Sequence, residues 1–461
     1  PFFGLGGPWV KRKNKESLML PTRVTMPATL LGLILAAQSA QADLTPEQVW
    51  EDWRSYIGGF GNEVSATETL SGDSLVVSDV LITTNIPEDQ GSATVEMGTL
   101  TFTSNGDGTV DISLAEVMPI VSSAIAEGEE VSYTLDFVNS GFTMTAAGDA
   151  SAIEYNYSAD SFGLNLTSLS VNGETIPPEG AQFEMTASGV SGQSKMENNA
   201  TRSYTQSFSA ETIAYTAAFS DPDSSEKLSV NASANSVRYN GTGTVPIDAM
   251  TSDDIADMMA AGFGLEGTFS FASGQSVTQS SGQNGGFAAN TASQGGQIGV
   301  NLGGSGISYD VQQSNLSVDV TTDQIPFPIS FTLENGKFNL TMPLVESEEV
   351  QDFGVGLTLA GFTMSDMLWG IFDPTGQLPR DPATVAFDMS GKGRLLFDFL
   401  DPAAATVSGN PNITPAEVEA VDINAIEVSV AGAALTGSGA FTFVNAPGAM
   451  PQPNGAVDLQ L

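Results

Sequence analysis

Alternation of apolar and polar residues with a period of two constrains this chain more than any other feature of its sequence. Val110, Ile112 and Leu114, for example, alternate with polar residues. Because successive side chains of a strand point to opposite faces, the pattern predicts half-buried β-strands. The alternation recurs in Leu100 and Phe102, Val131 to Phe137, Ile153 to Tyr157, Phe162 to Leu166, Leu316 to Val320, Ile329 to Leu333, Phe338 to Met342, and Phe441 with Phe443.

The connections between these segments are short, whereas parallel strands need crossover helices and near-continuous apolar runs. The sequence therefore predicts a mainly β fold of long antiparallel sheets, either a curved sheet or a sandwich, with a few short capping helices. One hairpin is predicted in detail, with Asn105-Gly-Asp-Gly108 as its tight turn. The apolar parity slips between Met97 and Leu100, which predicts a bulge at Gly98.

A helix is predicted shortly before the first strands. Thr45 and Gln48 are spaced as a capping box around Pro46, and Gly58-Gly59 ends the pattern. Its apolar residues fall on one face, and we expect that face to dock onto the sheet rather than onto a membrane, because Arg54 is its one basic residue. The face consists of Val49, Trp50, Trp53 and Ile57. Three further short helices are expected at residues 252–261, 365–372 and 415–420.

Residues 264–306 are rich in Gly, Ser, Gln and Asn but retain scattered apolar residues. A flexible linker is one interpretation, and weak edge strands with mobile turns are the preferred one. Gly141-Phe-Thr-Met144 recurs as Gly361-Phe-Thr-Met364, which fits two related halves on either side of this segment. The predicted organisation is a helix at 43–62, a first β region at 63–263, a Gly-rich connection at 264–306 and a second β region at 307–461.

The first residues have the order of a secretory signal. A basic cluster from Lys11 to Lys15 precedes the apolar run Met26 to Ala37 and the small-residue site Ala40-Gln41-Ala42. A retained membrane anchor is the alternative, but the run of roughly twelve residues is shorter than the ~20 that span a bilayer. Residues 1–42 are therefore predicted to be a cleaved extension and signal peptide, which places the mature protein in the periplasm.

Both ends of the sequence bear on the reading frame. No Met precedes the basic cluster, and the alternation of residues 457–461 stops inside a strand. These two features suggest a partial or misassigned frame.

From Asp43 onward the chain has 9 basic side chains (14 − 5) and 53 acidic ones (54 − 1), a net charge near −44. Because nucleic acids and anionic membranes are bound through Lys and Arg, nucleic-acid binding is excluded.

Missing residue types restrict the chemistry further. The chain has no His and no Cys, which excludes Ser-His-Asp and Cys-His nucleophiles, imidazole or thiolate metal sites, iron–sulfur clusters and disulfides. Residues 103–114 resemble a calcium-binding loop, but Thr103 and Leu114 stand where carboxylates are needed, so a plain turn is favoured. Ser224-Ser-Glu-Lys227 matches a serine acyl-enzyme pattern but follows a solvated turn. No catalytic, cofactor-binding or metal-binding residue is predicted.

Three segments resemble a known family. They are Leu44-Thr-Pro-Glu-Gln-Val-Trp50, the hairpin at Asn105-Gly-Asp-Gly-Thr-Val110, and Ser365-Asp-Met-Leu-Trp-Gly-Ile-Phe-Asp-Pro374 with its continuation to Gly391. Together they resemble domain-of-unknown-function family 2125, exported proteins known chiefly from alphaproteobacteria. The resemblance implies an exported envelope protein with no established activity. More distantly, the long sheet is similar to AsmA-type envelope proteins, whose curved sheets are associated with lipid handling; this likeness is at the level of the fold.

The leading hypothesis is a non-enzymatic periplasmic protein that binds a lipid or another apolar ligand along a sheet face. The competing hypothesis is a structural or adhesive envelope protein without a ligand, and a carboxylate-based hydrolase is third. No protein partner can be named. Five aromatic residues are expected to share one face that stays partly open: Tyr133, Phe137, Tyr155, Tyr157 and Phe162.

Overall fold

The computed structural model describes most of the chain from Leu44 onward, and its described residues belong to one compact unit, Leu35–Leu461. The predicted signal peptide lies outside the described residues. No helix in the described part is long and apolar enough to cross a membrane. The described residues are 44–59, 61–86, 91–126, 129–199, 201–221, 224–246, 255–283, 285–400, 415–445 and 451–461.

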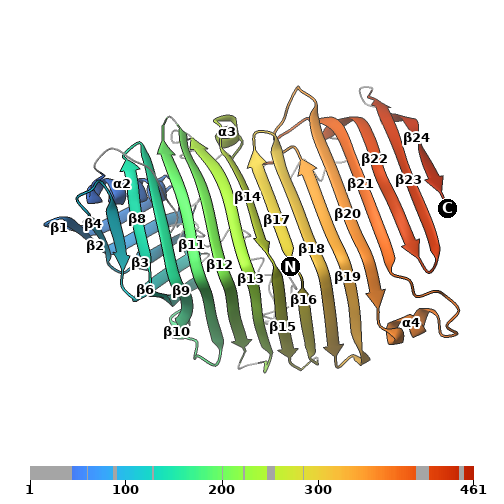
Figure 1. The fold of residues 1–461 in the computed structure, drawn as a ribbon, viewed down its shortest axis with the longest axis horizontal. Helices are drawn as coiled ribbons and strands as arrows, with labels where there is room; N and C mark the ends of the chain where they lie inside the picture. Colours follow the sequence, from blue (N-terminus) through green and yellow to red (C-terminus); the bar gives the residue numbers. More distant parts are fainter. Residues whose placement is uncertain are drawn as a thin grey trace. The chain divides into compact units, whose positions relative to one another are not determined.

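Within these residues, 24 strands form a single antiparallel sheet (Figure 1). The predicted fold class is thus confirmed, as one sheet and not a sandwich of two. The first half of the sheet has β1 (Asn62–Ser71), β2 (Ser74–Ile86), β3 (Gly91–Met97), β4 (Leu100–Ser104), β5 (Val110–Leu114), β6 (Val117–Ala126), β7 (Glu129–Ser140), β8 (Thr143–Asp149), β9 (Ala152–Val171), β10 (Glu174–Thr175), β11 (Ala181–Asn198), β12 (Thr201–Ser220) and β13 (Lys227–Pro246).

The second half continues the same ladder. It has β14 (Gly264–Phe271), β15 (Ser273–Ser281), β16 (Phe287–Ser293), β17 (Gly296–Gly303), β18 (Gly306–Thr322), β19 (Ile325–Met342), β20 (Gln351–Met364), β21 (Ala383–Leu395), β22 (Ala416–Val430), β23 (Ala433–Val444) and β24 (Gln452–Gln460). The described helices are α2 (Pro46–Gly58), α3 (Ile255–Ala260) and α4 (Asp366–Phe372).

Long strands alternate with pairs of short ones. β13 pairs along its first half with β15 and along its second half with β14, and both paths meet again on β18. In the same way β2 pairs with β3 and β4, and the two paths rejoin on β9. From β18 to β24 each strand pairs with the strands before and after it in sequence.

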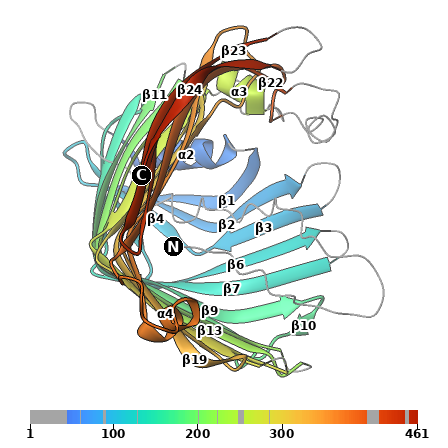
Figure 2. The same cartoon turned by 90° about the vertical axis from the view of Figure 1, so that its right-hand side faces the viewer.

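The N-terminal helix forms as predicted. The Thr45 side chain accepts a hydrogen bond from the Gln48 backbone, the Gln48 side chain accepts one from the Thr45 backbone, and Pro46 occupies the first turn. The helix lies against β1, β2 and β4 (Figure 2). Trp50 and Trp53 both pack on Phe102, with ring centroids 6.1 and 5.4 Å away. The predicted docking onto the protein's own sheet is therefore confirmed.

The predicted hairpin also forms, since β4 and β5 pair from Leu100 with Leu114 to Ser104 with Val110. The slip at Gly98 is larger than one bulged residue. Gly98 and Thr99 leave the ladder altogether between β3 and β4, opposite Asp79, which has a φ of 53°. Close packing explains the small residue, because a Cβ on Gly98 would lie 2.8 Å from the Met118 side chain.

The Gly-rich segment was assigned the wrong place in the sheet. It forms strands, but β14 to β17 are interior strands with a partner on each side rather than edge strands. Many of its glycines make room for aromatic rings from neighbouring positions. A Cβ on Gly296 would lie 2.5 Å from the Phe271 ring, and one on Gly267 would lie 3.0 Å from the Tyr239 ring.

The three other predicted helices have different outcomes. α4 confirms the helix expected at 365–372. α3 confirms the described part of the helix expected at 252–261, whose first residues lie outside the described residues. The helix expected at 415–420 is wrong, because these residues begin β22 and Val418 pairs with Gly393 of β21. Tertiary pairing overrides a local helical pattern of so few residues.

Candidate functional site

The antiparallel register brings apolar side chains from many strands into one continuous row. Residues that pair directly lie on the same face of a sheet, so one residue from each strand can be followed across the ladder. The row runs through Met144, Tyr157, Gly192, Phe208, Tyr239, Phe269, Ile298, Val311, Phe338, Leu357, Phe387, Ile426, Gly437 and Leu459. Every member is apolar, aromatic or glycine. We call the side of the sheet that carries this row the apolar face.

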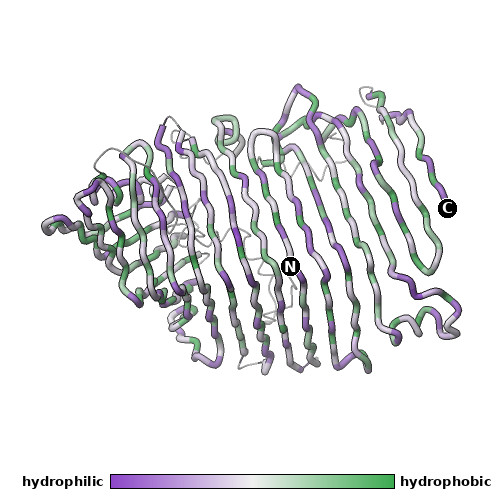
Figure 3. The backbone as a smooth tube through the Cα atoms, viewed as in Figure 1, coloured by the Kyte–Doolittle hydropathy of each residue, from purple (hydrophilic) through white to green (hydrophobic). Residues whose placement is uncertain are grey.

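The next residue of each strand lies on the other side and is mostly polar. The matching row there is Asn156, Gln193, Ser207, Asn240, Thr268, Gly299, Asp310, Asn339, Gly356, Asp388 and Ala425. Figure 3 shows the resulting alternation of hydrophilic and hydrophobic residues along the strands. We call this second side the polar face. The sheet is thus amphipathic from β9 to β24.

A set of left-handed residues keeps the apolar residues of long strands on one side. Ser236, Asn315 and Gly361 have φ values of 53, 47 and 68° within β13, β18 and β20. At this level of the sheet the alternation shifts by one residue, as is seen in β19, the strand between β18 and β20. There the Leu333 side chain lies 3.1 Å from the position of a Cβ on Gly336, which places Leu333 and Phe338 on the same face.

Coverage of the apolar face changes along the sheet. Tyr157 and Met144, at the beginning of the row, are 4% and 3% exposed. Farther along, five members of the row or of its immediate neighbours on the same strands are much more accessible. Exposed fractions are 39% for Phe338, 41% for Leu357, 39% for Leu359, 37% for Phe387 and 58% for Leu459. Scattered exposed apolar residues are ordinary, but a contiguous set of them indicates a binding surface.

Together with Ile298 of β17, which is 36% exposed, these residues define the candidate site, which we call the open apolar face and which extends from β17 to β24. The sequence had placed the open surface elsewhere, on five aromatic residues near the N-terminal end. Four of them are buried, at 0% exposure for Tyr155, 4% for Tyr157, 7% for Phe137 and 9% for Phe162, and Tyr133 is half-buried. That prediction is wrong because α2 and the neighbouring strands close this part of the face, with Trp53 and Tyr155 in ring contact at 6.2 Å.

A buried ion pair fixes α2 in its closing position. Asp52 accepts hydrogen bonds from Arg202 Nη2 at 2.5 Å, Asn198 Nδ2 at 3.0 Å and the Tyr155 hydroxyl at 3.1 Å. Side-chain exposure is 7% for Arg202 and 3% for Asp52. Burial and the nearby Asp52 charge raise the pKa of Tyr155 well above its ordinary value. These donors satisfy the hydrogen-bonding capacity of the Asp52 carboxylate and hold α2 to β11 and β12. We therefore interpret the cluster as structural.

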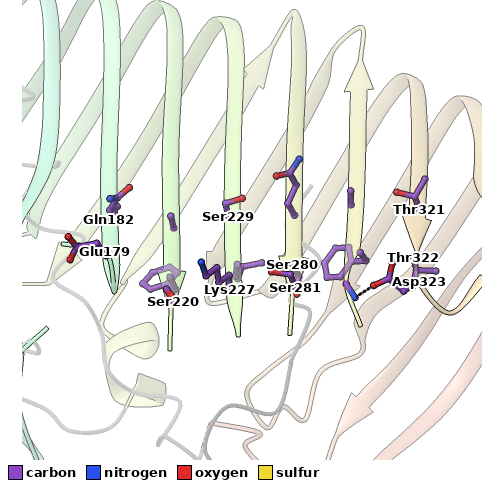
Figure 4. A pocket seen from close by; sticks show the side chains of 17 residues that line it. Glu179, Gln182, Ser220, Lys227, Ser229, Ser280, Ser281, Thr321, Thr322 and Asp323 are labelled. Carbon is purple, nitrogen blue, oxygen red and sulfur yellow. Dashed lines mark hydrogen bonds between the residues drawn. The ribbon is translucent and has the colours of Figure 1, made fainter. Parts of the chain in front are cut away.

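A separate concavity of about 770 Å³ lies at the ends of β11 to β18 (Figure 4). Its upper row, Gln182, Ser229 and Thr321, belongs to the polar face, and Lys227 is its one lining cation. Phe219, Leu228 and Phe287 also line it, so the concavity is of mixed polarity. Most of the strands that form it precede β17, where the open apolar face begins.

The motifs that the sequence analysis set aside form turns. In the loop that resembles a calcium site, Asp107 accepts hydrogen bonds from the Thr109 backbone and hydroxyl, which lowers the pKa of Asp107. Ser224 donates a hydrogen bond to Asp221, also in a turn. Among the residues that the structure describes, no cluster of three or more acidic, His or Cys side chains is arranged to hold a metal ion.

Comparison with known proteins gives no relative. No protein-family model matches the chain, and neither the curated proteins nor the solved structures include a significant match. The geometry of the chain itself therefore carries the functional argument.

Proposed function

We propose that this protein binds lipids, or another ligand with long hydrocarbon chains, along the open apolar face and that it is not an enzyme. The observation that carries the proposal is the uninterrupted apolar row, in which Phe338, Leu357 and Phe387 are exposed side by side on the neighbouring strands β19, β20 and β21. Exposure of such a surface to water costs about 25 cal/mol of free energy for each Å² of apolar area. A hydrocarbon ligand removes that cost without requiring polar partners.

The dimensions of the face favour an extended ligand. Eight strands, β17 to β24, contribute to its row, and neighbouring strands are ~4.8 Å apart, so the row is about 34 Å long. An open, elongated surface suits an acyl chain better than a compact solute.

We also propose that the protein is exported to the periplasm and that it is related to domain-of-unknown-function family 2125, which it resembles. A periplasmic location would place an apolar face where lipids must cross an aqueous space. The absence of His and Cys from the chain supports a binding role rather than nucleophilic or redox catalysis.

Titration with a fluorescent fatty acid tests the proposal. Leu357→Asp places a charge in the centre of the open apolar face, and we expect it to weaken saturable binding at least tenfold. The matched control is Thr358→Asp, the next residue of β20, which points to the polar face opposite Lys337 and should bind as the unmodified protein does. Tyr155 is unsuitable for this test because it is buried under α2.

Two results would count against the proposal. The first is absence of saturable binding by the unmodified, folded protein, which would favour the structural or adhesive role. The second is an equal loss of affinity in both variants, which would mean that the charge acts through stability and not through the face. Circular dichroism of each variant checks that the sheet is intact.

A further inference from the structure

A second apolar surface is formed by α4 and the segment after it, at one end of the strands (Figure 2). Three residues of the helix are strongly exposed, Met367 at 53%, Ile371 at 58% and Phe372 at 70%, and Leu378 follows at 47%. We call these four residues the α4 tip. Phe372 is among the most exposed large apolar residues that the structure describes.

The helix is held firmly enough to present these side chains outward. Trp369, one turn after the N-cap residue, is 9% exposed and points inward. The Ser365 backbone donates to the Ser330 carbonyl at 3.0 Å, which ties the start of α4 to β19. Its exposed apolar residues are therefore a fixed feature and not the inner face of a helix that has lost its packing.

Two acidic residues of the α4 segment are paired or buried. Asp366 forms an ion pair with Arg380. Asp373 is 7% exposed and accepts a hydrogen bond from the Leu378 backbone at 2.8 Å. Hydrogen bonds from the Gln377 and Leu378 backbones hold the pKa of the Asp373 carboxyl below its ordinary value. The tip thus offers apolar side chains with no excess of cations.

The size of the tip restricts what it can contact. A specific protein interface buries about 800 Å² on each partner, which three exposed side chains on a seven-residue helix and Leu378 after it cannot supply. Insertion of a few apolar side chains into the interface of a bilayer has no such requirement. Anionic lipids would be repelled by a chain of net charge −40, whereas zwitterionic lipids would not.

We propose that the α4 tip inserts into the surface of a zwitterionic lipid bilayer. The position of the tip relates it to the open apolar face. β20 ends at Met364, which pairs with Phe331, and the Phe331 and Phe362 rings are 5.8 Å apart. The chain passes from these residues directly into α4, so the inserted tip brings that end of the apolar face to the bilayer. Insertion itself does not depend on a ligand being held there.

Site-specific labelling tests this because the chain has no Cys. An environment-sensitive fluorophore is attached to Phe372→Cys, and to the control Leu70→Cys in β1, where Leu70 is 61% exposed. With phosphatidylcholine vesicles, we expect a blue shift and quenching by brominated acyl chains at position 372 and neither at position 70. An equal response at both positions, or no response at 372, overturns the proposal.

Vesicle cosedimentation of the unlabelled full chain gives a second readout. We expect Ile371→Asp to lower partitioning to phosphatidylcholine vesicles about tenfold and to leave the binding of monomeric fluorescent fatty acid unchanged. Leu357→Asp should have the opposite pattern, which separates a failure of this proposal from a failure of the proposed ligand site. Loss of vesicle binding in Leu357→Asp alone, or tighter binding to phosphatidylglycerol vesicles, would show that the tip is not the bilayer contact.

Discussion

Replacing Asp52 by alanine removes the acceptor at the centre of the anchor between α2 and the sheet. Three donors lose their partner: Arg202 at 2.5 Å, Asn198 at 3.0 Å and the Tyr155 hydroxyl at 3.1 Å. Arg202 keeps one hydrogen bond to the backbone carbonyl of residue 52, at 3.1 Å, but its charge stays buried without a counter-ion.

The expected magnitude follows from that burial. Removing one member of a buried ion pair costs about 3 to 5 kcal/mol, because the remaining charge is left desolvated. Tyr155→Phe removes one hydrogen bond to the same carboxylate and should cost roughly 1.5 to 3 kcal/mol. The control Glu51→Ala, in the same helix, breaks a solvent-exposed pair with Arg54 and should cost less than about 1 kcal/mol.

Urea unfolding followed by near-ultraviolet circular dichroism measures all three variants, since Trp50 and Trp53 report on the packing of α2. A dye that fluoresces on exposed apolar surface should respond more strongly to Asp52→Ala, because loosening α2 uncovers Phe102 and Tyr155. A loss of less than about 1 kcal/mol for Asp52→Ala, equal to that of Glu51→Ala, would refute the idea that the ion pair fixes the helix.

Other properties follow from packing, ionisation and processing. Gly192→Ala should cost about 1 to 3 kcal/mol in urea unfolding, because its Cβ would lie 1.9 Å from the Tyr157 hydroxyl oxygen; Tyr157→Leu in the same chain should recover part of the loss. Burial raises the pKa of Tyr204 from 10.0 to about 12, so its contribution to stability is complete below pH 10 and declines as the pH rises toward 12. Tyr204→Phe should make that alkaline decline in unfolding free energy shallower, and an unchanged slope would contradict it. Intact-mass analysis of periplasmic protein should give a chain that begins at Asp43, not an uncleaved one.

Elements whose formation depends on residues close together in the sequence could be predicted from the sequence. The capping box of Thr45 and Gln48 and the apolar spacing of Trp50 and Trp53 specify α2, and both operate within a few residues. The same is true of the hairpin around Asn105. Alternation of apolar and polar residues also identified some of the strands, among them β5, β7 and β18, because a strand with one buried and one exposed face needs only that local pattern.

Pairing between distant strands could not be predicted in the same way. Ile329 to Leu333 and Phe338 to Met342 looked like two strands, but both belong to β19, because the break in parity between them is a bend and not a turn. Glycine-rich strands were mistaken for edges because the rings that fill the space above their glycines come from other positions, as Phe271 does over Gly296. Composition does not reveal such complementary pairs.

The location of the candidate site depended on the same long-range information. Tyr155 and Leu357 have similar alternating surroundings in the sequence, yet one is 0% and the other 41% exposed. The difference is made by α2, which covers Tyr155. Asp52 of α2 and Tyr155, which are in contact, are 103 residues apart in the sequence. A period-two pattern shows that a face is apolar, and only the tertiary structure shows whether something covers it.

The strictly sequential pairing of β18 to β24 gives this part of the molecule the thermodynamics of a one-dimensional array. Each of β19 to β23 exchanges hydrogen bonds with the strand before it and the strand after it in sequence, so the stability of each strand depends on these nearest neighbours. Amide hydrogen exchange should then be slowest in the strands beside α2 and faster in the sequentially paired strands β19 to β23. Partial opening would shorten the open apolar face strand by strand while the anchored end around Asp52 and Arg202 stays folded.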